Sequence, residues 1–306
     1  MRLRFQPWQI ATALALAGAL ATLVAPQLLK RTSGKTNLVV YLPATNASVV
    51  YIDVDGLRRS GMLDMLAGSK TAEEPEYQQF VSETQFDYRR DLDAMAAAFR
   101  DGHVYFALRG RFHWKNLSDY AAHQGGSCHN NFCVLPGSQP NRRISFYPLE
   151  PDLLAMAIGP DDFAAYQIKR QANAVAIPAP GQPVWAIVPA AALEHSGMLP
   201  DSAKPYLSAL QGADQIVFSV GPDAGHLQLA LHVTCKDAAA ASALLANFQG
   251  ATSTLRQWIN QAHQPANPAD LTGLLVAGAF RRDDRQVYGQ WPIPKAFLDA
   301  IAGGSY

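Results

Sequence analysis

The sequence has 306 residues, enough for about two ordinary domains, and 49% of them are apolar, as in a globular protein. Glycine and proline are close to their average frequencies, which excludes collagen-like and low-complexity chains. Positions 1–35 hold five basic residues and no acidic residue, so the rest of the chain has 20 basic against 25 acidic residues. This acidic balance argues against a nucleic-acid partner, because phosphate backbones are bound by clustered lysine and arginine.

An apolar N-terminal segment predicts export. Ile10–Leu29 is a nearly unbroken apolar run after Arg2 and Arg4, and as a helix it would be about 30 Å long, which is the thickness of a bilayer core. If the segment is an uncleaved signal anchor, the chain is a single-pass membrane protein. Its N-terminus then lies in the cytoplasm and its body is extracytoplasmic. A cleaved signal peptide would release a periplasmic or secreted body. We favour the anchor, because Pro26 makes cleavage after Ala25 unfavourable.

Two of the three cysteines lie close together in the sequence. Cys128 and Cys133 flank the pair Asn130-Asn131, and asparagine tolerates the left-handed backbone conformations of a turn. Opposed residues of an antiparallel hairpin are close enough for a disulfide, so we predict a Cys128–Cys133 bond. Free thiols and a metal site that also uses His129 are the alternatives. The metal site lacks the second pair of ligands that structural zinc requires, so we expect no metal and no cofactor.

The body repeats itself. Three sequence matches occur in the same order in two parts of the chain, which indicates two copies of one module. They pair Ser60-Gly61-Met62-Leu63 with Ser196-Gly197-Met198-Leu199, His103–Leu108 with Gln215–Val220, and Pro160 and Phe163 with Pro294 and Phe297. We therefore predict an N-terminal segment over 1–35, a first module over 36–177, a proline-rich linker over 178–183 and a second module over 184–306.

Each copy mixes strand and helix patterns. The predicted strands are 37–42, 48–54, 103–110, 144–158 with a break at 148–151, 227–235, 274–280 and 285–290, and the predicted helices are 87–99, one that begins near 116–118, 161–171 and 238–260. The expected fold class is α+β, with a mainly antiparallel or mixed sheet in each copy and helices on one face, after the N-terminal hydrophobic helix.

One motif resembles a catalytic site. The segment Val49–Leu57 reads VVYIDVDGL, and it is similar to the first motif of the haloacid-dehalogenase-like phosphatases. The resemblance implies that Asp53 is a nucleophile and Asp55 a general acid in a magnesium-dependent reaction. The sequence departs from that family at Leu57, and the second copy replaces Asp53 with Pro189 and Asp55 with Ala191.

A second resemblance covers the start of the first module. Leu42-Pro43-Ala44-Thr45-Asn46, the strand Val49–Val54 and Leu57 are similar to a group of poorly characterised bacterial extracytoplasmic proteins, whose paired modules begin with a Leu-Pro-Ala turn and a strand. That resemblance implies an envelope protein and supplies no catalytic residues.

Together these features predict a membrane-tethered extracytoplasmic protein that binds or assembles without catalysis. Its expected partners are the membrane, through Ile10–Leu29, and a protein of the cell envelope. One alternative is a phosphatase that uses Asp53 and Asp55, and another is a carrier of an apolar ligand held between the two modules.

Overall fold

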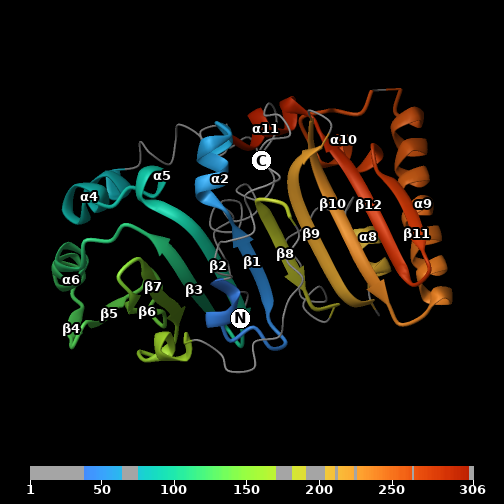
Figure 1. Cartoon of the computed structure of the whole chain (residues 1–306). Helices are drawn as coiled ribbons and strands as arrows, with labels where there is room; N and C mark the ends of the chain where they lie inside the picture. The colour runs from blue at the N-terminus through green and yellow to red at the C-terminus, as the bar shows by residue number, and fades with distance from the viewer. Residues whose placement is uncertain are drawn as a thin grey trace. The chain divides into compact units, whose positions relative to one another are not determined.

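The computed structural model describes residues 38–63, 75–169, 181–190, 204–210, 213–223, 226–263 and 265–302 (Figure 1). The chain divides into two compact units. The first unit contains the described residues of Leu28–Arg59 and Ser69–Pro183, and the second unit contains those of Ser60–Gly68 and Val184–Tyr306.

The first unit is an antiparallel sheet with short helices. Its described strands lie in the order β1-β2-β3-β7-β6-β5-β4. They are β1 (Ser48–Ile52), β2 (Leu92–Arg100), β3 (His103–Gly110), β4 (Ser127–His129), β5 (Phe132–Pro136), β6 (Arg143–Glu150) and β7 (Leu153–Gly159). Its helices are η2 (Leu38–Tyr41), α2 (Val54–Arg59), α4 (Pro75–Thr84), α5 (Tyr88–Asp91), α6 (Trp114–His123) and η3 (Ala164–Gln167), where η denotes a 3-10 helix.

The second unit is also an antiparallel sheet with helices. Its described strands lie in the order β11-β12-β10-β9-β8. They are β8 (Val184–Val188), β9 (Ala213–Asp223), β10 (His226–Cys235), β11 (Ala279–Asp283) and β12 (Gln286–Ile293), and the helices are α8 (Lys204–Ala209), α9 (Ala238–Gln261), α10 (Leu271–Val276) and α11 (Lys295–Ala302). The long helix α9 lies beside β11 (Figure 1). It begins where predicted, because the carboxylate of Asp237 accepts a hydrogen bond from the amide of Ala240 at 2.7 Å.

The two units share one strand order, and the predicted α+β class is confirmed. Numbered along the chain from β1, β2, β3, β6 and β7, or from β8 to β12, the strands lie in the order 1-2-3-5-4 in each unit. Pro160 and Pro294 directly follow the corresponding strands β7 and β12, as their sequence match predicted. The match of His103–Leu108 with Gln215–Val220 is wrong, because the strand order pairs β9 with β2 and β10 with β3.

The predicted helix over 87–99 is also wrong. Only Tyr88–Asp91 is helical, and Leu92–Arg100 forms the strand β2. Leu92, Met95, Ala96 and Phe99 have helical spacing, but the alanines in this stretch are buried in the sheet. Tertiary packing therefore outweighs the helix propensity of alanine.

Three other predicted elements differ from the structure. The expected strand 37–42 is the 3-10 helix η2, whose apolar side chains cover the sheet instead of extending it. The expected helix 161–171 is reduced to η3 over its described part. The expected strand 274–280 is divided between the helix α10 and the strand β11, and β11 continues to Asp283. The hairpin turn is therefore confined to Asp284-Arg285, whereas the predicted strands left 281–284 between them.

Some predictions fall outside the described residues. These include the span Ile10–Leu29, the second Ser-Gly-Met-Leu match at 196–199 and the first half of the linker, 178–180. Across the described ranges, none of the helices has the length and apolar character that a bilayer crossing requires.

One face of the first unit's sheet is lined by alanine. Ala96 pairs with Ala107 and Ala107 pairs with Ala155, so three alanines form a row across β2, β3 and β7. Ala98 and Ala157 lie in the next row of the same face, on either side of the buried Tyr105, and all five alanines are fully buried. Because these side chains are so short, the backbones of η2 and η3 contact these strands closely.

The opposite face of this sheet packs against α6. Leu117 and Ala121 of α6 form one buried cluster with Cys133, Phe146 and Leu154 of the strands. Phe80 of α4 adds a further apolar contact to this cluster, and α4 contacts α6 beside the sheet (Figure 1). The sheet of the first unit is therefore covered on both faces, by η2 and η3 on one face and by α6 on the other, and not on one face as predicted.

Candidate functional site

Asp53 begins a helix. Its Oδ1 atom accepts a hydrogen bond from the amide of Gly56 at 3.0 Å, and its carbonyl oxygen accepts one from the amide of Leu57 at 3.0 Å. The residue is 8% exposed at the N-terminus of α2. This is the geometry of a helix N-cap, which satisfies amides that have no partner inside the helix.

Asp55 lies within the first turn of α2 and is paired along the helix. Its carboxylate lies 3.3 Å from Nη1 of Arg58 and 3.1 Å from Nη2 of Arg59. Burial, together with the charge of Asp53, raises the pKa of the nearby Tyr51 to about 12, so that this phenol stays protonated at neutral pH. Both carboxylates singled out by the sequence thus stabilise α2.

Metal binding at this position would need further ligands. Over the ranges that the structure describes, no three His, Cys, Asp or Glu side chains are grouped so that they could hold a metal ion. The contacts of these two carboxylates include the backbone amide of Gly56 for Asp53 and the guanidinium groups of Arg58 and Arg59 for Asp55.

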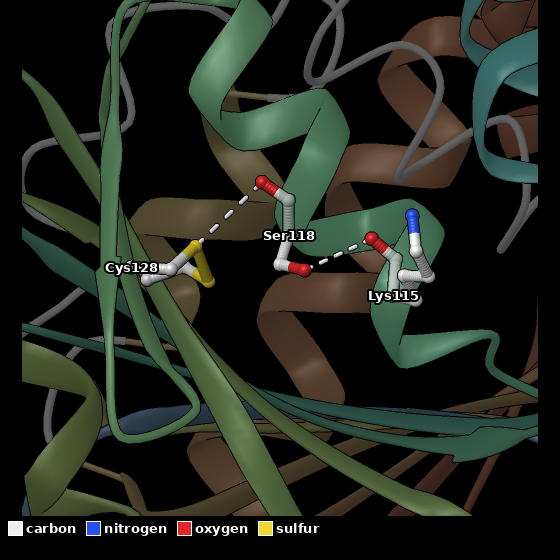
Figure 2. The surroundings of a disulfide bond; sticks show 4 residues. Lys115, Ser118 and Cys128 are labelled. Atoms are coloured by element: carbon white, nitrogen blue, oxygen red, sulfur yellow. Dashed lines mark hydrogen bonds between the residues drawn. A yellow bond between two sulfur atoms is a disulfide. The ribbon is translucent and has the colours of Figure 1, made fainter.

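The predicted hairpin joins Cys128 to Cys133. The strands β4 and β5 pair these two residues directly, and the structure has a disulfide between them with a Cα–Cα distance of 4.1 Å. Asn130 and Asn131 have φ angles of 50° and 65°, which are the left-handed values expected of a two-residue turn. The Sγ atom of Cys128 faces the carbonyl oxygen of Ser118 on α6 at 3.7 Å (Figure 2). The disulfide therefore lies between the sheet edge and α6.

An aromatic patch was missed by the sequence analysis. It consists of Phe132 of β5, Tyr147 of β6, and Phe163 and Tyr166 at η3. The ring of Tyr166 stacks on Phe132 with a centroid distance of 4.1 Å, and the ring of Phe163 lies 5.9 Å from Phe132. Phe132 is buried, whereas Phe163 is 61% and Tyr166 54% exposed. Two aromatic rings thus face solvent above a third.

Hydrogen bonds fix the segment that carries the exposed rings. The amide of Ala165 donates to Oγ of the fully buried Ser145 at 3.1 Å, and the hydroxyl of Tyr147 donates to the carbonyl of Ile168 at 2.6 Å. The amide of Lys169 donates to the carbonyl of Tyr41 in η2 at 3.0 Å. Burial and the neighbouring Tyr166 raise the pKa of Tyr147, so its hydroxyl keeps the proton that it donates.

Two carboxylates border the patch, and one of them is paired with an arginine. Asp162 forms an ion pair with Arg143 at 2.7 Å, and Oδ1 of Asp161 accepts a hydrogen bond from the amide of Phe163 at 2.9 Å. Exposed aromatic groups of this kind mark interaction surfaces, because burying them against a partner removes apolar area from water. The patch is therefore the candidate functional site.

Comparisons with known proteins give the fold and no family. No protein-family model matches the sequence, and no curated protein matches it. Among solved structures, crystal form I of TP0453 is similar to this chain, with a TM-score of 0.51 at 9% sequence identity over 89% of this chain and 99% of that one. Crystal forms III and IV of TP0453 align with TM-scores of 0.46 and 0.45 at 7% identity, over 89% of this chain and 100% and 97% of theirs.

The capping role of Asp53 predicts an unusual response at Gly56. A Cβ atom at position 56 would lie 2.7 Å from Oδ2 of Asp53, so Gly56→Ala should disturb the cap. We expect this variant to lose about 1 kcal/mol of stability, although alanine normally favours a helix. Urea unfolding of the full chain in detergent measures the change.

Gly250 provides the matched control. It lies inside α9, and a Cβ atom there would meet nothing within 4 Å. Gly250→Ala should therefore stabilise the chain by about 0.5–1 kcal/mol. If Gly56→Ala stabilised the protein as much as Gly250→Ala does, Asp53 would not be acting as a cap.

The disulfide predicts a defined peptide map. Mass spectrometry of the protein prepared without reductant should give a linked Cys128–Cys133 peptide. Cys235 is 2% exposed, so it should react with an alkylating agent only after unfolding. Recovery of Cys128 and Cys133 as separately alkylated residues would contradict this assignment.

Proposed function

We propose that this protein is a membrane-tethered, extracytoplasmic binding protein without catalytic activity, and that the aromatic patch is its binding surface. The observation that carries the proposal is the fixed exposure of Phe163 and Tyr166 above Phe132. A surface that is already ordered loses little conformational entropy on binding, which favours recognition through a small area.

Two sets of observations support the proposal, one on catalysis and one on location. Asp53 and Asp55, which the phosphatase hypothesis needs at a substrate, are occupied in capping and pairing α2. The export segment and the hairpin disulfide both favour an extracytoplasmic body, since disulfides persist outside the reducing cytoplasm.

A photo-reactive amino acid at position 163 tests the proposal in living cells. Phe163 is replaced by benzoylphenylalanine, and illumination should give a covalent adduct to a protein or to a lipid, which is identified by its mass. A large aromatic side chain already occupies this position and is mostly exposed, so the replacement should not disturb folding.

Trp258 is the matched control position. It lies in α9 of the second unit and is 64% exposed, but it has no part in the patch. We expect no adduct when the photo-reactive residue replaces Trp258. Equal labelling at both positions, or none at position 163, would contradict the proposal that the patch is a binding surface.

A further inference from the structure

We infer that the aromatic patch docks onto the surface of the bilayer to which the chain is tethered. This inference rests on the proposed function and names the partner of the same surface. Three observations carry it. They are the position of η2 in the chain, the backbone hydrogen bond between η2 and the segment 163–169 that carries the exposed rings, and the chemistry of the patch.

The chain enters the fold close to the predicted membrane span. The span ends at Leu29 and η2 begins at Leu38, so residues 30–37 connect the two. Even a fully extended chain of this length reaches at most about 30 Å. The start of η2 must therefore remain within that distance of the membrane surface whenever the span is inserted.

The segment 163–169, which carries the exposed rings, is hydrogen-bonded to η2. The amide of Lys169 donates to the carbonyl of Tyr41, the last residue of η2, and Lys169 follows Tyr166 by three residues. In addition, Nη1 of Arg100 lies 3.5 Å from the carbonyl of Pro43, and Nη2 lies 3.1 Å from Oε1 of Gln167 in η3. The segment that carries the exposed rings is thus hydrogen-bonded to the part of the first unit where the tether enters it.

The exposed side chains are those that suit a lipid interface. Aromatic rings gather at the headgroup level of membrane proteins, and a tyrosine there keeps its hydroxyl in the polar layer. Of the two bordering carboxylates, that of Asp162 is paired with Arg143 and that of Asp161 accepts a hydrogen bond from the amide of Phe163. The ion pair lowers the cost of bringing the patch up to the headgroups. Tethering also raises the effective concentration of the membrane at the patch, so a small aromatic contact is enough.

An environment-sensitive fluorophore tests the docking. The side chain of Lys169 is exposed beside the patch, so Lys169→Cys labelled with nitrobenzoxadiazole reports on the patch and leaves its rings intact. The native cysteines are in the disulfide or buried, so the label reacts at position 169. The full chain is reconstituted into vesicles of phosphatidylethanolamine and phosphatidylglycerol.

We expect the emission at position 169 to shift to shorter wavelength in the vesicles and to be quenched by nitroxide-labelled lipid. The double change Phe163→Ser and Tyr166→Ser should abolish both effects, whereas Trp258→Ser should preserve them. Both rings are more than half exposed, so the double variant retains its buried packing, which circular dichroism verifies. A label that stays in water, or a shift that persists in the double variant, would overturn the inference.

The failure of the docking inference can be told apart from failure of the tether. The same vesicles are washed with alkaline carbonate, which removes peripheral proteins and leaves spanning helices in place. If the chain is retained but the label stays in water, only the docking inference fails. Extraction of the chain by carbonate would contradict the tether, and with it the proposed function.

Discussion

The arrangement of the first unit depends on the short side chains of one sheet face. Alanines of β2, β3 and β7 form rows on this face, and all are fully buried. An alanine row lets another backbone approach the sheet closely, where leucine or phenylalanine would hold it away. Because the row is shallow, short 3-10 helices are able to cover it, and η2 and η3 do so.

This close packing determines which side chains of η3 face solvent. Ala164 and Ala165 face the sheet and are fully buried, so Phe163 and Tyr166 are left on the outside. The buried hydroxyl of Ser145 accepts a hydrogen bond from the amide of Ala165, and this bond fixes the distance of η3 from the sheet. Holding Phe163 and Tyr166 exposed is unfavourable in free energy without a partner, since it leaves apolar area in water. The hydrogen bonds that nevertheless fix the rings in this position suggest a binding role.

Local patterns predicted some elements well. The Asn130-Asn131 pair and the flanking cysteines indicated a hairpin, because turn conformation and strand opposition depend on a few neighbouring residues. The start of the predicted helix 238–260 agrees with α9 for the same reason, since the N-cap Asp237 acts over three residues. The match of Pro160 with Pro294 also indicated the repeat correctly, because the two prolines follow corresponding strands in the shared strand order.

Other features depend on contacts between distant parts of the chain, and the sequence analysis missed them. The alanine-rich stretch of β2 has helical spacing, and only its position between β1 and β3 makes it a strand. The roles of Asp53 and Asp55 could not be separated from those of a catalytic pair by sequence, because a cap and a nucleophile use the same carboxylate. The aromatic patch joins β5, β6 and η3, and the closeness of Phe132 to Tyr166 follows from the strand order together with the packing of η3 on β6 and β7.

Amide hydrogen exchange of an Ala157→Leu variant tests most directly whether the alanine face positions the patch. Ala157 is fully buried and pairs with Ser145, which holds the amide of Ala165. A leucine there should displace η3, so the amides of Ile168 and Lys169 should lose protection, while the exposed Ala122→Leu on α6 should leave them protected. Unchanged protection in the folded Ala157→Leu variant would contradict the account.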